Sequence, residues 1–338
     1  MGAKMPCTKE KIKHKAKNID TCTYIKYNIF MKKKGDFRMA RQQDNRNFSK
    51  VKSPATIEAQ LEKLKSRGCI IEDEEHAINA LSNINYYRLV HYFSVFLKDK
   101  HTYRDGTSFE AVMRIYDFDR LLRSLLLTVL EEIEITLRAH VSNYHALKYG
   151  ALGYLNEASF DCRHNHKQFL NKVDRMIESN TGEEMVTHHM RKYGGAFPLW
   201  VIMELFSFGT LNTFFSDLIT EDKRAIAQDA FGLPYRCAEN WLQCLSALRN
   251  HCAHYNRLYA NDFTDTPKQP PDSDRPVSNT LFDYIIIMKY LYPRKERWNS
   301  VFLTRLAMLI AEYSDVLELN LLGFPDNWRE LLAQEGGL

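Results

Sequence analysis

Arg249, Asn250 and His254 stand close together near the end of a run of helical periodicity, and their side chains suit chemistry on a phosphodiester. An arginine offers a forked pair of donors to non-bridging phosphate oxygens, and a histidine side chain exchanges a proton near neutral pH. RNA supplies its own nucleophile, the 2′-hydroxyl, so its cleavage needs only proton transfer and charge stabilisation. The pattern therefore favours a ribonuclease that needs no metal ion and forms no covalent intermediate.

The stretch from about 235 to 260 is expected to form one amphipathic helix. At about 100° per residue, an apolar stripe faces the core and consists of Trp241, Cys244, Leu245, Leu248, Cys252, Tyr255 and Tyr259. The opposite face is polar and consists of Gln243, Asn250, His254 and Arg257, flanked by Arg249 and His251. A solvated face more often mixes Glu with Lys, so this cationic set predicts supporting roles for His251 and Arg257.

The spacing of the pair adds a constraint. Arg249 and His254 are separated by about 140° around a helix axis, whereas Asn250, His254 and Arg257 share one row. Arg249 must then reach around its own helix or serve a neighbouring one. A site completed by a second copy across a two-fold axis satisfies this constraint, so we expect a homodimer.

Three charged residues elsewhere are candidates to support this face. Glu134 and Arg138 lie four residues apart on a long predicted helix, which favours an ion pair or, alternatively, a role in positioning the active face. Glu204 lies in an apolar stretch and must be paired or exposed to stay charged. It either orients Arg249 or His254 or serves helix packing.

No metal or cofactor is predicted. The seven cysteines are scattered without a Cys-x-x-Cys pair, which also argues against disulfides. Two histidine pairs, at 164 and 166 and at 188 and 189, lack the helical spacing of metal ligands.

The elements that position these residues are predicted to be helices throughout. Apolar residues recur at helical spacing from Phe109 to about Tyr149, which indicates a long helix as the spine of a bundle. Shorter helices are predicted from 57 to Gly68 and at about 72–81, 86–97, 165–180, 183–193, 198–219, 280–291, 296–313 and 326–334. Residues 261–278 are expected to form an exposed loop. Strand-like alternation is nearly absent, so the fold class is all-α.

The charge is unevenly distributed. Residues 1–52 hold 15 Lys and Arg against 4 Asp and Glu, whereas the whole chain has a net charge of only +4. This basic arm is interpreted either as a flexible, solvated extension, part of it upstream of the true start, or as an RNA contact. The residues for such a contact are Lys32, Lys33, Lys34, Arg38 and Arg41. No apolar run is long enough to span a membrane, and no secretory signal is evident, so a cytoplasmic protein is expected.

The run Leu245–Tyr259, with Arg-Asn-x3-His inside it, resembles the signature of the Abi family of AbiD/AbiF-like abortive infection proteins within the HEPN superfamily. The hallmark of that superfamily is Arg-x4-6-His, often with Asn after the Arg. Three other segments, 60–68, 85–93 and 198–211, are similar to the same family. The resemblance covers roughly residues 54–320.

This resemblance implies an all-α domain over 53–320, with a HEPN-like core at about 109–260 and a C-terminal helix or tail at 321–338. It implies dimerisation, metal-independent RNA cleavage and phage-triggered growth arrest, with Arg249 and His254 as the catalytic pair and Asn250 beside them. An RNA or protein antitoxin is an expected partner. The chain departs from HEPN toxins paired with a nucleotidyltransferase, because Asn256 stands where those have Tyr.

The alternative interpretation is a protein that binds a structured RNA without cutting it. The basic arm favours tight RNA contact, which would weaken steeply with salt. Growth arrest that survives loss of His254 would favour this alternative.

Overall fold

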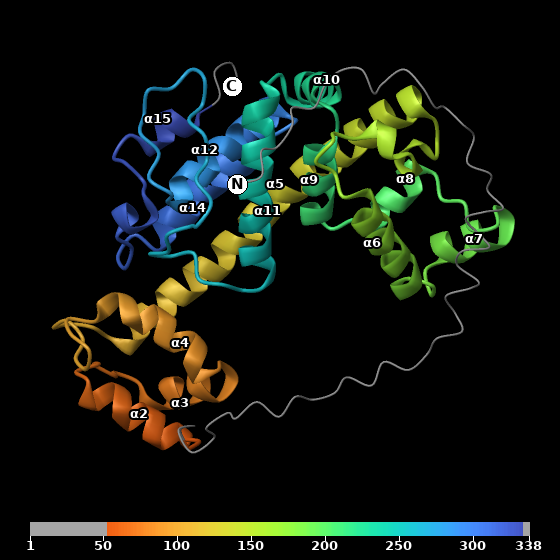
Figure 1. The fold of residues 1–338 in the computed structure, drawn as a ribbon. Coiled ribbons are helices and arrows are strands. Elements are labelled where there is room, and N and C mark those ends of the chain that lie inside the picture. The colour runs from red at the N-terminus through yellow and green to blue at the C-terminus, as the bar shows by residue number, and fades with distance from the viewer. Residues whose placement is uncertain (1–52, 334–338) are drawn as a thin grey trace, which may run out of the picture. The chain divides into compact units, whose positions relative to one another are not determined.

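One long helix, α5 (Phe109–Tyr149), contacts elements from both ends of the chain. The computed structural model describes residues 53–333 (Figure 1). The Ser108 side chain caps the first turn of α5 by accepting the Ala111 N–H at 3.1 Å, and Gly150, at φ 85°, ends the helix. Its 41 residues, at about 1.5 Å each, span about 62 Å. The sequence predicts these bounds, and the structure confirms them.

The described part of the chain is all-α, as predicted, and contains only isolated β-bridges besides helices. The described residues from Ile57 onward belong to one compact unit. Its helices besides α5 are α2 (Ile57–Ser66), α3 (Glu74–Asn83), α4 (Tyr86–Phe93), α6 (His166–Ser179), α7 (Glu184–Lys192), α8 (Leu199–Ile202), α9 (Phe208–Asp217), α10 (Thr220–Phe231), α11 (Tyr235–Ala253), α12 (Leu281–Leu291), α13 (Lys295–Arg297), α14 (Thr304–Glu312) and α15 (Trp328–Leu332).

Helices α2, α3 and α4 precede α5 and pack at its N-terminal end. The backbone of Ile70 bonds to Thr107 and Phe109 at 2.9 and 2.8 Å, which ties the loop after α2 to the start of α5. The side chain of Asn85 caps α4 by accepting the Tyr87 N–H at 2.8 Å. Since α4 also contacts α5, its residues lie at a defined place beside the long helix.

The single helix predicted for 198–219 is wrong, because the chain breaks after α8. A 3₁₀ turn over Met203–Leu205 follows α8, and α9 starts afresh at Phe208. The side chain of Ser207 accepts the Thr210 N–H at 3.2 Å and so caps the new helix. Arg138 of α5 donates to the carbonyls of Met203 and Phe206, which supplies partners to backbone groups that the break leaves open.

Helix α10 was missed by the sequence reasoning. Its pattern is weakly amphipathic, with Ile226 and Ala227 as its buried apolar residues. Gly232 ends it in the left-handed conformation, at φ 67°. The signal for a helix was present in this terminal glycine and in the acidic first turn, Glu221 and Asp222.

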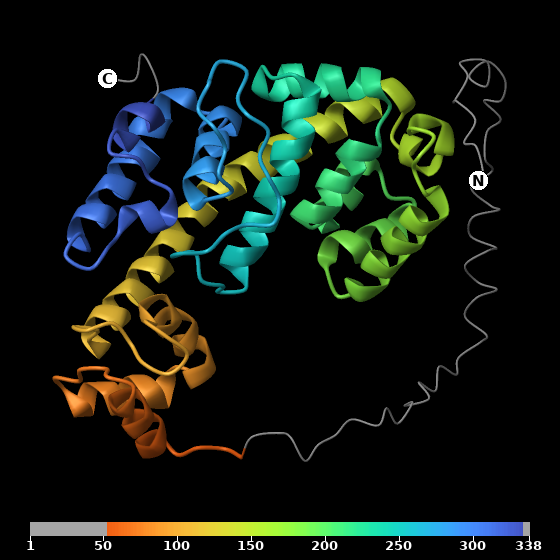
Figure 2. The ribbon, with the colours of Figure 1, turned by 60° about the vertical axis from the view of Figure 1, so that its left-hand side comes forward.

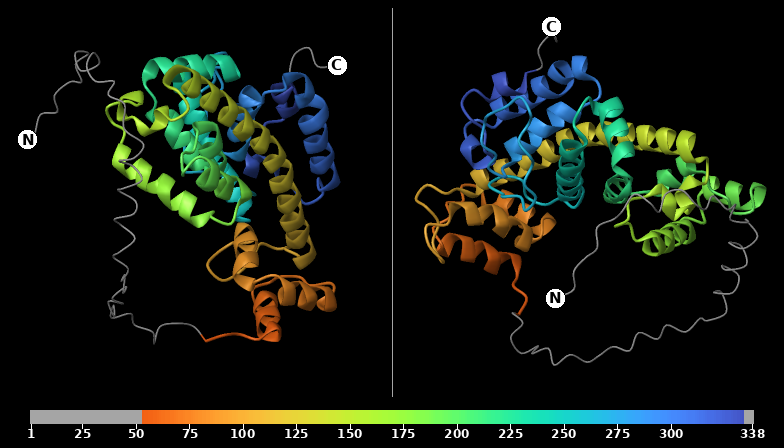
Figure 3. Two further views of the ribbon diagram at one scale, coloured as in Figure 1. Left: turned by 90° about the vertical axis from the view of Figure 1, so that its right-hand side faces the viewer. Right: turned by 45° about the horizontal axis from the view of Figure 1, so that its top comes forward.

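Helix α11, which carries the candidate motif, packs against both α5 and α9. Figure 2 shows α11 (teal) lying across α5 (yellow). The C-terminal helices α12 and α14 (blue in Figure 3) contact α5 as well, and α15 packs on α12. A π-helical turn, Trp298–Leu303, joins α13 to α14. The motif helix is thus held between the long helix and elements far away in sequence.

None of the helices in the described range is both long enough and apolar enough to cross a membrane.

Candidate functional site

Helix α11 ends at Ala253, seven residues before its predicted end at 260. The N–H of Tyr255 bonds to the carbonyl of Cys252 at 3.1 Å, and the N–H of Asn256 bonds to that of His251 at 2.9 Å. This pair of bonds defines a Schellman turn, in which the residue after the cap adopts the left-handed conformation. Glycine usually occupies that position, but here it is Tyr255, at φ 60°.

This early end corrects the predicted row of Asn250, His254 and Arg257. Arg257 lies beyond the helix and donates to the carbonyls of His91 and Ala260, so it holds the chain instead of joining a helical face. Asn250 is exposed in the last turn, and His254 is the exposed C-cap. Within residues 53–333 the His254 imidazole has no hydrogen-bond partner, so it is open to a ligand.

A buried carboxylate, Asp119 of α5, fixes the segment that follows this turn. It accepts the backbone N–H groups of Leu258 and Tyr259 at 2.8 and 3.0 Å. Arg123 and Tyr92 donate to the same carboxylate at 2.9 and 2.8 Å. Burial raises the pKa of Asp119, and the hydrogen bonds oppose that shift. The chain after the motif is therefore anchored to α5 and α4.

A second carboxylate on α5, Glu134, reaches the arginine of the motif. It forms the predicted ion pair with Arg138, with Nη2 and Oε1 2.7 Å apart. Its other oxygen, Oε2, lies 3.9 Å from Nε of Arg249. Arg249 also donates weakly to the side chain of Asn250, at 3.4 Å. Within the described residues its Nη2 has no partner, so part of the guanidinium is available to an anion.

The other two predicted supporting residues take different places. Glu204 is exposed in the 3₁₀ turn after α8, and nothing in the described structure bonds it to Arg249 or His254. His251 packs its ring on Phe263, with centroids 5.4 Å apart. Burial lowers the pKa of His251, so this side chain is neutral at neutral pH and adds no cation to the face.

A cleft of about 660 Å³ lies between α4 and the turn after α11. From α4 it is lined by Tyr87 and Arg88, and from the turn by Tyr255 and Asn256, among others. No Asp or Glu is among the residues that line it. His254 does not line the cleft but adjoins it through its neighbour Tyr255.

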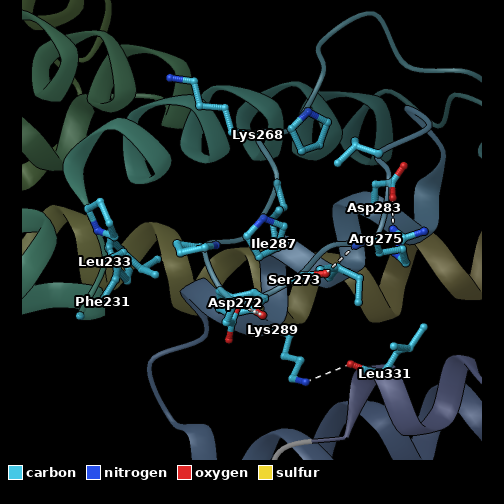
Figure 4. A pocket seen from close by; sticks show the side chains of 18 of the residues that line it. Phe231, Leu233, Lys268, Asp272, Ser273, Arg275, Asp283, Ile287, Lys289 and Leu331 are labelled. Atoms are coloured by element: carbon cyan, nitrogen blue, oxygen red, sulfur yellow. Dashed lines mark hydrogen bonds and ion pairs between the residues drawn. The ribbon is translucent and has the colours of Figure 1, made fainter.

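A larger hollow, of about 1000 Å³, lies elsewhere, against α12 and the loop before it (Figure 4). Several of its polar groups are already matched: Arg275 forms an ion pair with Asp283, and the Tyr290 hydroxyl donates to Asp272 at 2.5 Å. Figure 4 also shows Lys289 directed at the carbonyl of Leu331. Neither Arg249 nor His254 lines this hollow, so size alone does not identify the candidate site.

The sequence reasoning missed the anchoring network of Asp119, Arg123 and Tyr92. A signal was available, because Asp119 and Arg123 stand four residues apart and directly follow the apolar residues Phe118 and Leu122. An acid and a base at that spacing on the core face indicate a buried ion pair. Their partners after α11 could not be inferred, since these depend on how two distant segments pack.

Of the two histidine pairs considered for metal binding, His164 and His166 make packing contacts and hydrogen bonds. His164 Nδ1 lies 2.8 Å from Asp217, and its ring stacks on Phe160 with centroids 4.0 Å apart. His166 contacts His164 and the carbonyl of Leu155. Across residues 53–333 no group of three or more His, Cys, Asp or Glu side chains is placed to hold a metal ion.

The basic arm, 1–52, and with it the proposed RNA contacts at Lys32, Lys33, Lys34, Arg38 and Arg41, lies outside the described residues.

Comparison with known proteins places the motif in a family. The sequence model of the family described as Abi-like protein matches residues 79–260, more than half of the chain. The matched range runs from within α3 to just beyond α11 and so includes both carboxylates of α5 and the whole motif. No curated protein and no solved structure matches the chain.

Proposed function

The chain belongs to the Abi-like protein family, and we propose that it is an endoribonuclease that acts in abortive infection. In this proposal Arg249 binds the scissile phosphate and His254 moves the protons. Asn250, exposed in the last turn of α11, adds a polar contact beside them. A metal ion is not required, because the 2′-hydroxyl of RNA is the nucleophile.

The observation that carries the proposal is the state of the two motif side chains at the end of α11. Arg249 is oriented by Glu134, yet it keeps free donors. His254 is exposed on a turn whose following residues are bonded to α5. A cation that keeps a free Nη2 and an acid–base group whose imidazole has no hydrogen-bond partner within residues 53–333 are thus presented on a fixed frame.

The reaction has three proton transfers. One His254 takes the proton of the 2′-hydroxyl, whose oxygen attacks phosphorus and displaces the 5′-oxygen of the next nucleotide. That oxygen takes a proton from water, and the protonated imidazole of His254 then gives its proton to the hydroxide that remains. The products are a 2′,3′-cyclic phosphate and a 5′-hydroxyl. Arg249 neutralises the charge that grows on the non-bridging oxygens.

A homodimer is part of this proposal. Arg249 lies in α11 and His254 is its C-cap, five positions later, so helical spacing places them about 140° apart, and a second copy is a direct way to bring both onto one phosphate. Ile135, next to Glu134 on α5, is 55% exposed, and Trp200 of the adjoining α8 is 49% exposed. These apolar side chains beside the site favour a partner surface there.

The test uses purified full-length protein, single-stranded RNA and EDTA. We expect fragments that end in 2′,3′-cyclic phosphate, and a loss of at least about a hundredfold in rate for His254→Ala and for Arg249→Ala. His188→Ala and Arg305→Ala, at exposed positions outside the motif, are the matched controls. RNA that stays bound but intact with the unaltered protein would support the binding protein instead.

The abortive role is tested in cells. Expression of the unaltered chain during phage infection is expected to arrest growth, and His254→Ala is expected not to. Arrest that is equally strong with His254→Ala would disprove the link between cleavage and growth arrest.

A further inference from the structure

Two tyrosines stand exposed at the cleft between α4 and the turn after α11. Tyr87, from α4, is 73% exposed, and Tyr255, from the turn, is 66% exposed. Each contributes a ring from a different side of the same cleft. Large aromatic faces in water are ready platforms for stacking against another flat ring.

Tyr255 is held in a conformation that its side chain disfavours. A left-handed backbone costs a non-glycine residue about 1–2 kcal/mol, and the turn would form as readily with glycine. Arg88 nevertheless fixes it, donating to the Tyr255 carbonyl at 2.5 Å with its guanidinium carbon 5.9 Å from the ring centroid. Backbone strain of this kind clusters at ligand-binding and active sites, which makes Tyr255 a candidate binding residue.

The lining of the cleft holds two arginines and no Asp or Glu, although the buried Asp119 acts electrostatically on Arg257. Arg88 and Arg257 both line it and both donate to backbone carbonyls. In the described structure neither forms an ion pair, and no carboxylate lines the cleft. A phosphate is the ligand group that such guanidinium donors favour.

Side-chain amides complete the lining. Asn256 is exposed, and within the described range its side chain makes no hydrogen bond. Asn261 makes only a long bond, 3.3 Å, to the carbonyl of Asp262. An amide offers both donors and acceptors, which is what the edge of a nucleobase requires.

From these contacts we infer that the cleft binds one unstacked base of single-stranded RNA, with Tyr255 and Tyr87 as stacking platforms, Arg88 on a phosphate and Asn256 at the base edge. Its volume of about 660 Å³ is in the range of small-molecule sites. Since Tyr255 follows His254 directly, the bound nucleotide adjoins the phosphate that is cut. The inference rests on the proposed function for the identity of the strand as RNA.

The experiment measures binding separately from cleavage. The full-length His254→Ala chain is titrated with a fluorescent single-stranded oligoribonucleotide in EDTA, and anisotropy is recorded. Adding Tyr255→Gly keeps the turn and removes the ring, and we expect affinity to fall roughly 5- to 100-fold. Tyr255→Phe keeps the ring and is expected to retain affinity. Tyr193→Ala removes an exposed ring that does not line the cleft and is the control.

A second variant and two competing nucleic acids test the same cleft independently of Tyr255. Tyr87→Ala changes the other side of the cleft without touching the turn, and we expect it to weaken binding by a similar factor. Unlabelled duplex RNA, whose bases are stacked and paired, is expected to compete poorly against the single strand. A single-stranded DNA of the same sequence tests how far the 2′-hydroxyls contribute.

The outcomes separate this inference from the proposed function. Unchanged affinity in both Tyr255→Gly and Tyr87→Ala, or equal competition by duplex RNA, overturns the base-binding cleft even if the protein cuts RNA. Weakened binding in both variants supports the cleft even if the unaltered protein leaves RNA intact. In that second case only the nuclease proposal fails.

Discussion

Two ion pairs on the same helix hold the two ends of the motif in different ways. Asp119 and Arg123 are almost fully buried, and their carboxylate is saturated by backbone and side-chain donors. Glu134 and Arg138 are only partly buried, and the carboxylate meets Arg249 at the longer distance of 3.9 Å. The two carboxylates are fifteen residues, or about 22 Å, apart along α5.

The difference shows which part of the site is rigid. Asp119 and Arg123 bind backbone groups just after the turn, so the frame that carries His254 cannot shift without breaking a buried network. Glu134 orients the guanidinium of Arg249 but leaves that side chain able to move towards a ligand. In the proposed reaction, a fixed His254 and an adjustable Arg249 would suit a substrate that arrives as a flexible strand.

The largest effect is expected from removal of the buried carboxylate. Asp119→Ala leaves the buried Arg123 without a counter-charge, and we expect the free energy of unfolding to fall by about 3–5 kcal/mol. Asp117→Ala, on the same helix, breaks an exposed pair with Arg120 and is expected to cost less than about 1 kcal/mol. Urea denaturation measures both. Equal losses in the two variants would show that burial of the network is not what matters.

The stability of the protein at mildly acidic pH tests His145, which lies on α5 on the C-terminal side of both ion pairs. Burial lowers the pKa of His145 to about 4, whereas an exposed histidine titrates near 6.5. The unfolded chain therefore binds this proton first, so stability is complete above pH 6.5 and falls by about 3 kcal/mol as the pH approaches 4. His251, whose pKa burial also lowers, acts in the same direction.

Equilibrium unfolding between pH 7 and pH 4 measures this loss. In His145→Leu the dependence is expected to shrink to the part that His251 and the other titrating groups supply. An undiminished slope in His145→Leu would place the acid sensitivity elsewhere.

Glu134→Gln removes the negative charge that orients Arg249, the more mobile side chain of the motif. We expect a stability loss of no more than about 1 kcal/mol, since the ion pair is only partly buried. RNA cleavage is expected to slow by about tenfold, because Arg249 loses the group that orients it. Glu131→Gln, at an exposed position on α5, is the control for both measurements. A large stability loss with unchanged cleavage would reverse the roles assigned to the two carboxylates.

The smallest effect is expected at the turn itself. Tyr255→Gly relieves the left-handed strain but adds freedom to the unfolded chain, and the two effects, each about 1 kcal/mol, oppose each other. Thermal unfolding should therefore show little change, whereas Tyr255→Ala, which keeps the strain, should be less stable than the glycine variant. A destabilisation of Tyr255→Gly greater than that of Tyr255→Ala would show that the ring supports the turn.

Local patterns predicted much of this architecture. The bounds of α5 were predicted from apolar residues that recur at helical spacing from Phe109 to about Tyr149, and the structure adds the Ser108 cap and the terminal Gly150. The ion pair of Glu134 and Arg138 follows from their spacing. The family match agrees with the resemblance that the motif carries.

The remainder depends on packing between distant segments. Nothing local marks the end of α11 at Ala253, because Tyr255 occupies a position where glycine is the usual signal. That error misplaced Arg257, whose partner His91 lies more than 160 residues earlier in the chain. Both the cleft and the Asp119 network join α4 or α5 to the segment after α11, and periodicity within one helix carries no information about such pairings.

In the proposed dimer, Arg249 of one copy and His254 of the other act on the same phosphate. Mixing Arg249→Ala with His254→Ala protein, each inactive alone, tests this directly through cleavage of single-stranded RNA in EDTA. After subunit exchange we predict that the mixture regains cleavage well above either variant alone, because a mixed dimer holds one arginine and one histidine at the shared site. A mixture that exchanges subunits but stays as inactive as its components would contradict the claim.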